Sequence, residues 1–281
     1  MFSPVPPPFR HTAGGAPPPP PFFGIPVRQV WANNLDAEVR AVRALAANAR
    51  YVAVNVQYPG VVFNAAGNAD PCAVTAEERY AAVKANVDAL KPLQLGIAVG
   101  THDGRCVAWE FNLSGFDRAA DQHAPGSVAY LAGRGMDLDA HRARGVPAAR
   151  LAAALHRCGL LRGRGFAWVT YAGVYHVAYL LKIVTGGQPL PGDVAGFLDA
   201  VRGFLGEEVY DVARLVVDCP TLPVGLERVA NALGLAPPLW SPRLAGAGAA
   251  LALQAFAALE FNVFRGDVSR YRGLLNGLQV T

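Results

Sequence analysis

Charged side chains are scarce in this chain. They make up 16% of its 281 residues, whereas about a quarter is typical of a soluble domain. Acids are the scarcer sign, because 21 acids face 25 bases and leave a net charge of +4. Nearly all the bases are arginines spread along the chain, so no basic block indicates a nucleic-acid-binding tail. The hydrophobic share of 52% is ample for a core and excludes disorder throughout.

Cysteine is also rare. Cys72, Cys106, Cys158 and Cys219 lie far apart and form no CxxC pair. This spacing excludes a zinc ribbon and a disulfide framework, and it is typical of a reducing compartment. The first residues lack the unbroken apolar run of a secretory signal. We therefore expect a protein of the cytoplasm and nucleus.

Long hydrophobic runs are nearly absent, and residues 244–264 come closest to a membrane span. A span needs about 20 apolar residues. Gln254, Glu260 and Asn262 fall within this run, which favours a buried core helix. We expect no contact with a membrane.

Proline and glycine divide the chain into two parts. Residues 1–24 contain the runs PPP and PPPPP, which favour polyproline II, a conformation that has no internal hydrogen bonds and builds no core. They predict a disordered tail, with a docking site for an SH3-type or WW-type module as the alternative. From Ile25 onward the pattern is globular, so residues 25–281 are predicted to form a single domain.

The globular part alternates strand and helix patterns, which predicts an α/β fold. Residues 51–58, YVAVNVQY, are typical of a strand, and residues 93–99 and 106–113 form a hairpin around Asp103-Gly104. A first helix begins near Asp36. Further helices are predicted near 76–91, 147–158, 174–185, 193–205, 211–217, 224–233 and 245–260, with a short strand over 167–171.

The sequence contains none of the common catalytic motifs. It has no GxxxxGK[ST] loop, no HExxH, no GxSxG and no GxGxxG after a strand. A lone histidine is more often a surface or core residue than a ligand. From spacing alone, the function of the α/β domain is undefined. The six histidines are each isolated: His11, His102, His123, His141, His156 and His176.

Several segments, taken together and in order, resemble a known family. The longest is VWANNLDAEVRAVRALAANARYVAVNVQYPGVV, residues 30–62. The chain resembles the Caf/Pop type poly(A)-specific ribonucleases, the deadenylase subunit of the Ccr-Not complex. The resemblance implies a ribonuclease H-like fold of the DEDD exonucleases, with a mixed central sheet flanked by helices. The other segments are NVDALKPLQLGIAV (86–99), WEFNL (109–113), GFAWVTYAGVYHVAYLLKIVTG (165–186), VYDVARLV (209–216), GLERVANALGL (225–235) and YRGLLNGL (271–278).

The family's catalytic positions all differ in this chain. Where the family reads M-D-T-E-F-P-G-V-V, the first two carboxylates are replaced by Asn55 and Gln57. His176 stands at the position of the third, within the stretch that matches H-S-G-Y-D-F-G-Y-L-I-K, and Gly248 stands at the fourth, within H-Q-A-G-S-D-S-L-L. Arg243 replaces the auxiliary histidine that activates water. The resemblance thus implies a degenerate site with no intact catalytic residue.

The lost carboxylates change what the site can bind. The family's reaction is phosphodiester hydrolysis with two Mg²⁺ or Mn²⁺ ions, which need several carboxylate ligands. With no carboxylate at the four positions, we expect no metal cofactor. Asp36, Asp88 and Asp211 are other acids that could take over as metal ligands, but none stands at one of the family's catalytic positions.

These observations favour a catalytically inactive Caf-like protein, a pseudonuclease that binds subunits of the Ccr-Not complex or other proteins. One alternative is an active poly(A)-specific 3′–5′ exoribonuclease with an altered metal site. Another is a protein that binds RNA without cutting it, through a groove that Arg243 and His176 make more basic. An exonuclease assay separates the enzyme from the other two.

Overall fold

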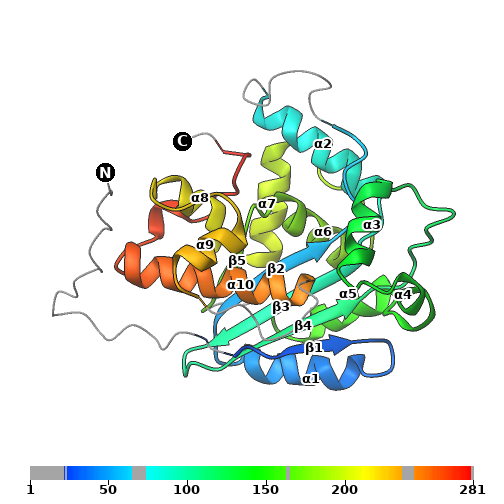
Figure 1. Cartoon of the computed structure of the whole chain (residues 1–281), viewed down its shortest axis with the longest axis horizontal. Coiled ribbons are helices and arrows are strands. Elements are labelled where there is room, and N and C mark those ends of the chain that lie inside the picture. The colour runs from blue at the N-terminus through cyan, green and yellow to red at the C-terminus, as the bar shows by residue number, and fades with distance from the viewer. Residues whose placement is uncertain (1–21, 23, 65–73, 163–164, 236–243, 280–281) are drawn as a thin grey trace, which may run out of the picture.

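A mixed sheet forms the centre of the fold. The computed structural model describes residues 22, 24–64, 74–162, 165–235 and 244–279. The strand order is β1-β4-β3-β2-β5-β6 (Figure 1). β2, β3 and β4 are antiparallel neighbours, whereas β5 and β6 run parallel to β2, and β1 runs parallel to β4. The strands are β1 (Val27–Val30), β2 (Ala49–Gln57), β3 (Gln94–Thr101), β4 (Cys106–Asn112), β5 (Ala167–Thr170) and β6 (Val209–Asp211).

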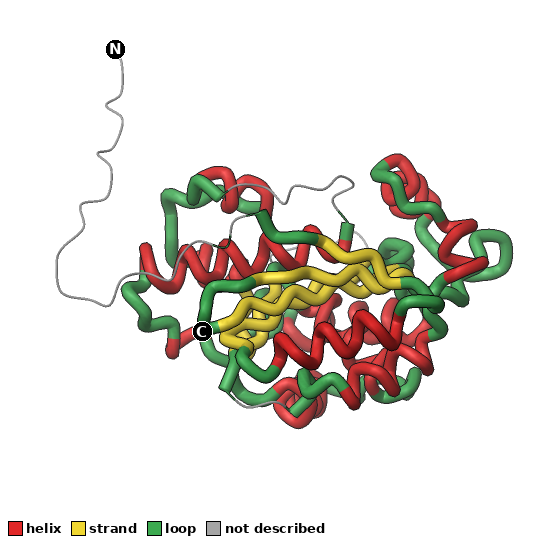
Figure 2. The backbone as a smooth tube through the Cα atoms, turned by 90° about the horizontal axis from the view of Figure 1, so that it is seen from below, coloured by secondary structure: helices red, strands yellow, loops and turns green. Residues whose placement is uncertain are grey.

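Helices cover both faces of the sheet (Figure 2). Successive side chains of a strand point to opposite faces, so Val54 of β2 packs in one core while Ala53 packs in the other. Asn55 and Gln57 therefore share the face of Ala53. One layer contains α1 (Leu35–Ala46), α2 (Ala76–Ala89), α5 (Ala148–Arg157), α6 (Val174–Val184) and α7 (Val194–Leu205); the other contains α8 (Val212–Val217), α9 (Leu226–Ala232) and α10 (Ala245–Ala258); α3 (Pro125–Gly133) and α4 (Leu138–Arg144) complete the fold.

Helix α10 lies directly on the sheet, against β2, β3 and β4. Among the described residues, one helical stretch, Ala245–Val263, is long and apolar enough to cross a membrane. Its most apolar window is 67% buried inside the protein, because its alanines and glycines let the helix approach the strands closely. The prediction of a buried core helix is confirmed.

The first turn of α10 is capped by side chains of the sheet. Leu244 stands at the N-cap and has no side-chain acceptor to offer. The Gly246 N–H instead donates to Glu110 Oε2 at 2.8 Å, and the Ala245 N–H donates to Gln94 Oε1 at 3.4 Å. Two of the free N–H groups of the helix start are thereby satisfied, and β3 and β4 fix where α10 begins.

Gly96 tests how closely α10 and β3 pack. A Cβ atom at Gly96 would lie 2.0 Å from the backbone oxygen of Ala245, so Gly96→Ala is expected to destabilise the fold by about 3 kcal/mol. Urea unfolding measures the loss. Gly126→Ala is the control, because a Cβ there meets nothing within 4 Å. Equal stability of the two variants would contradict the close packing.

Most of the predicted elements are present. The strand over 51–58, the hairpin and the helix over 76–91 are confirmed as β2, β3 with β4, and α2. The prediction missed β1, α3, α4 and β6, which are all short: β1 and α4 have one buried residue each, α3 contains two glycines, and β6 is three residues long. The helix expected over 211–217 begins one residue later, since Asp211 is its N-cap.

The N-terminal boundary of the domain stays a prediction. Residues 1–21 and 23 of the predicted tail lie outside the described residues. Phe22 is buried beside Ile25, and its carbonyl oxygen accepts a hydrogen bond from the Gln254 side chain. The packed part of the chain therefore includes Phe22.

Candidate functional site

Three of the five residues expected in the degenerate site meet at one point. Asn55 is near the end of β2, His176 is in the first turn of α6, and Gly248 is in the first turns of α10. Gln57 follows on the same face of β2, with its side-chain amide 3.3 Å from that of Asn55. Arg243 lies outside the described residues.

Asp211 fixes the turn that delivers His176. Its buried carboxylate accepts four backbone N–H groups, from Ala172 at 2.7 Å, Gly173 at 2.9 Å, and Ala213 and Asn276 at 3.0 Å. Burial raises the pKa of Asp211, and the four donors act against this rise. Ala172 has a φ of 48°, an uncommon value for a residue with a side chain. The carboxylate holds this turn and so the start of α6.

Both ring nitrogens of His176 have partners within the protein. The Val56 N–H of β2 donates to Nδ1 at 3.0 Å, and the Asn55 amide lies 3.2 Å from Nε2. Burial lowers the pKa of His176 to about 4, so the ring is neutral at pH 7. A neutral ring that accepts at Nδ1 carries its proton on Nε2, and this N–H faces the side-chain nitrogen of Asn55. His176 joins α6 to β2 and has no free nitrogen for a ligand.

Gly248 lets α10 close against Asn55. A Cβ atom at Gly248 would lie 2.9 Å from Asn55 Cγ and 3.0 Å from its amide nitrogen. These contacts are shorter than ordinary packing allows, so the space in which a side chain at 248 would begin is filled. The substituted positions form a tightly packed neutral junction of β2, α6 and α10.

A tyrosine stack lies beside this junction. Tyr58 stacks on Tyr175 and on Tyr179, with ring centroids 5.0 Å apart in both pairs. The rings of Tyr58 and Tyr175 are half-buried, and burial raises the pKa of Tyr175. Sequence reasoning missed this feature, although tyrosines four residues apart share one helix face and Tyr58 directly follows Gln57.

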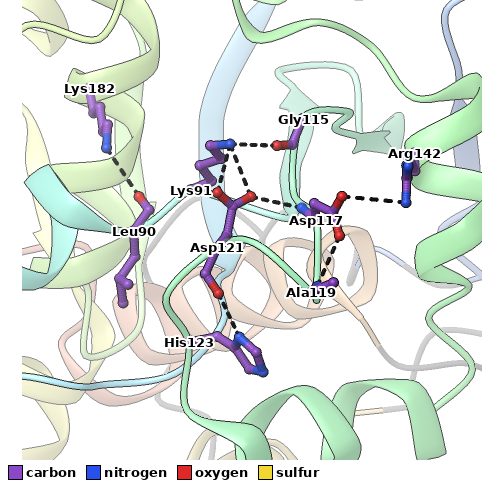
Figure 3. Close-up of polar contacts among 9 residues, drawn as sticks. All are labelled: Leu90, Lys91, Gly115, Asp117, Ala119, Asp121, His123, Arg142 and Lys182. Carbon is purple, nitrogen blue, oxygen red and sulfur yellow. Dashed lines mark hydrogen bonds and ion pairs between the residues drawn. The ribbon is translucent and has the colours of Figure 1, made fainter.

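The segment between β4 and α3 passes the end of β2 and is held by polar contacts (Figure 3). Lys91 forms an ion pair with Asp121 at 2.9 Å, and the same carboxylate accepts the Asp117 N–H at 2.7 Å. The Ala124 N–H donates to the Pro59 carbonyl oxygen at 2.9 Å. These bonds fix the segment next to the residues that follow β2.

The three acids that could take over as metal ligands have other roles in the structure. Asp36 is exposed and pairs with Arg150, Asp88 pairs with Lys84 at 2.6 Å, and Asp211 holds the turn before α6. Within the described part of the chain, no three His, Cys, Asp or Glu side chains gather as metal ligands would.

The sheet order and the helix α10 across its face define a class of protein. Three antiparallel strands, β4, β3 and β2, continue into two parallel ones, β5 and β6, and this is a ribonuclease H-like fold. Escherichia coli Exonuclease I has the same fold, with a TM-score of 0.52, 14% identity, and coverage of 76% of this chain and 42% of that one. The predicted fold class is confirmed.

The chain belongs to the CAF1 family of ribonucleases. The family model described as CAF1 family ribonuclease matches residues 30–154. "Probable CCR4-associated factor 1 homolog 7" of Arabidopsis thaliana is 30% identical over 266 residues, which are 91% of this chain and 94% of that protein. "Poly(A) ribonuclease pop2" of Schizosaccharomyces pombe is 29% identical over 91% of this chain and 76% of that protein.

Two solved structures extend the comparison. S. pombe Pop2p in its Mg²⁺ and Mn²⁺ bound form superposes with a TM-score of 0.81 at 28% identity, covering 90% of this chain and all 100% of that one. CAF1 co-crystallized with the yeast NOT1 MIF4G domain gives 0.71 at 24% identity over 93% of this chain and 100% of that chain. The second likeness is one of fold.

The prediction that no metal cofactor is expected is wrong, because the Pop2p structure is a Mg²⁺ and Mn²⁺ bound form and metal ions thus accompany this family. The residues at the four positions here do not fit two such ions. Asn55 and Gln57 offer neutral amides, both nitrogens of His176 are hydrogen-bonded, and Gly248 has no side chain. Hard divalent cations select carboxylate oxygens, and these positions provide none.

Proposed function

We propose that this chain is a CAF1-family pseudonuclease that does not cut RNA and acts by binding other proteins, in or against a Ccr-Not complex. The observation that carries the proposal is the neutral junction of Asn55, His176 and Gly248, which is held by hydrogen bonds and close packing; we match these positions to the family's carboxylates. We propose that it acts in the cytoplasm and nucleus.

The chemistry of the family reaction supports this proposal. Two-metal hydrolysis stabilises the charge on the attacking and leaving oxygens through the ions and their ligands. Removing a single group that stabilises a transition-state charge costs about 10²–10³ in kcat. Four positions have changed at once here, and Gln57, Asn55 and His176 bond with one another or with the backbone.

An exonuclease assay tests the proposal. A 5′-labelled oligo(A) is incubated with the full chain in Mg²⁺ or in Mn²⁺, with S. pombe Pop2p as the positive control. We expect shortening at least about a thousandfold slower than with Pop2p. A rate within about tenfold of the control would support an enzyme with an altered metal site. A gel shift with the same oligo(A) tests the RNA-binding alternative, since the tyrosine stack offers ring faces to bases.

The scaffold role is tested with a purified partner. CAF1 was co-crystallized with the MIF4G domain of NOT1 from yeast. This chain has the same fold as that CAF1 protein. A NOT1 MIF4G domain from the same source as this chain is titrated into it by calorimetry. We expect a one-to-one complex that an active CAF1 protein displaces. Absence of binding would contradict the scaffold role, whatever the nuclease assay shows.

A further inference from the structure

A concave site lies outside the neutral junction. It is a pocket of about 450 Å³ between the edge strand β1, helix α4 and the first turn of α10. Figure 1 shows these elements near one end of the sheet. Its volume falls within the range of about 300–1,000 Å³ seen for small-molecule sites. The wall residues that matter below are Trp31, Glu110, Met136, Asp137, His141 and Arg144.

The polar wall of the pocket is a one-way hydrogen-bond chain. Gln94 donates to Asn112 at 2.7 Å, Asn112 donates to Gln29 at 2.9 Å, and Gln29 donates to Glu110 at 2.7 Å. The Gly246 N–H donates to the other oxygen of Glu110. Burial raises the pKa of Glu110, and the donors around it oppose that rise. Because its partners are all donors, Glu110 is held as a carboxylate, and its remaining lone pairs are acceptors.

His141 adds a buried acceptor. Its side chain is 4% exposed, and Nδ1 has no hydrogen-bond partner. Burial lowers the pKa of His141, and the backbone groups of Leu113 and Leu93 act in the opposite direction. The ring is therefore neutral, and Nδ1 is the ring nitrogen that is left without a partner. A buried acceptor without a donor costs about 1–3 kcal/mol, so the site favours a ligand that donates.

An aromatic ring completes the pocket. The guanidinium of Arg144 lies 5.0 Å from the centroid of the Trp31 ring, and the Trp31 ring meets His141 edge to face. Indole faces attract cations, and this one already contacts a guanidinium of the protein itself. Asp137 contributes a second carboxylate at the wall, with Oδ1 accepting the Ala140 N–H at the start of α4 and Oδ2 left over, so two acids outweigh the single base, Arg144.

We propose that this pocket binds an organic cation of the guanidinium class, either a free guanidine or an arginine side chain of a peptide. A guanidinium has five N–H donors and no acceptor, which matches the free acceptors of Glu110, His141 and Asp137. A nucleobase fits less well, because its ring nitrogens are acceptors that would face acceptors. The proposal does not depend on whether the chain cuts RNA.

Calorimetry with the full chain tests this site. The probes are agmatine and the tripeptide Gly-Arg-Gly, and the controls are butylurea, a neutral analogue, and AMP. We expect agmatine or the peptide to bind and butylurea not to bind. The stronger of the two cations identifies a free or a peptide-borne ligand. Binding of AMP or butylurea at least as tight as that of both cations, or binding by neither cation, would overturn the proposal.

Variants assign the binding to the pocket. Glu110→Gln removes the charge without changing the size of the side chain, and it should weaken cation binding about tenfold or more. Asp139→Asn is the matched control, because its carboxyl is exposed on α4 and does not line the pocket. Arg144→Gln removes a competing cation from the Trp31 ring and should tighten binding about threefold. Thermal melting confirms that each variant is folded, and unchanged binding in both pocket variants would overturn the assignment.

Discussion

Replacing Asp211 by alanine is expected to destabilise the fold by about 4 kcal/mol or more. Four backbone N–H groups lose their common acceptor, and an unsatisfied donor costs about 1–3 kcal/mol where it is buried, as at Gly173. Urea unfolding at neutral pH measures the loss. Because Ala172 and Gly173 lead into α6, near-ultraviolet circular dichroism should also report loosened packing around the tyrosines.

Two further variants are compared with Asp211→Ala in the same measurement. Asp211→Asn keeps one carbonyl oxygen and should lose about half as much stability. Asp199→Ala removes an exposed carboxylate that pairs with Arg202 on the surface, and it should change stability by less than about 1 kcal/mol. A loss of less than about 1 kcal/mol for Asp211→Ala would mean that the turn does not depend on this carboxylate.

Restoring the four carboxylates is expected to turn a neutral junction into a strained one that metal ions relieve. The variant combines Asn55→Asp, Gln57→Glu, His176→Asp and Gly248→Asp. Clustered like charges repel, and the side chain at 248 must enter the space next to residue 55. We expect a lower melting temperature in EDTA. Saturating Mn²⁺ or Mg²⁺ should raise it by about 5–10 °C, the effect of a ligand at about 100 times its Kd on a chain of this size.

A smaller variant separates charge from packing. Asn55→Asp with Gln57→Glu is isosteric, so it adds two charges without new atoms at position 248 and keeps His176 on the Val56 N–H. It should fold and show a weaker metal response than the fourfold variant. The wild-type chain with the same additions is the reference. A fourfold variant that melts independently of both ions would show that these positions do not form the metal site.

The strands and long helices could be predicted because burial imposes a pattern on the sequence. β2 has to place Val54 in one core and Ala53 in the other, and the run of small apolar residues in α10 follows from its place on the sheet. β1 has one buried residue, Val30, among its four, so it carries almost no pattern. Such an edge strand is defined by its neighbour, which single-sequence reasoning does not see.

The site was predictable in its positions and not in its contacts. The resemblance placed Asn55, His176 and Gly248 at equivalent points, and the fold brings them together. The ring of His176 accepts a backbone N–H of β2. Whether the ring reaches this N–H depends on where β5 ends, and that is a property of the whole sheet. Asp211 was considered as a spare ligand, whereas it accepts four N–H groups, from the turn before α6, from the start of α8 and from Asn276.

The hydrogen-bond chain along the pocket wall has a direction, and that direction is set by its end points. Gln94, Asn112 and Gln29 each pass a donor toward Glu110. An amide in place of Glu110 would turn its nitrogen toward Gln29, reverse all three amides, and leave Gln94 facing the Ala245 N–H with a donor instead of an acceptor. The carboxylate of Glu110 therefore sets the orientation of three side chains on three strands. Through them it also sets the position of α10 on the sheet.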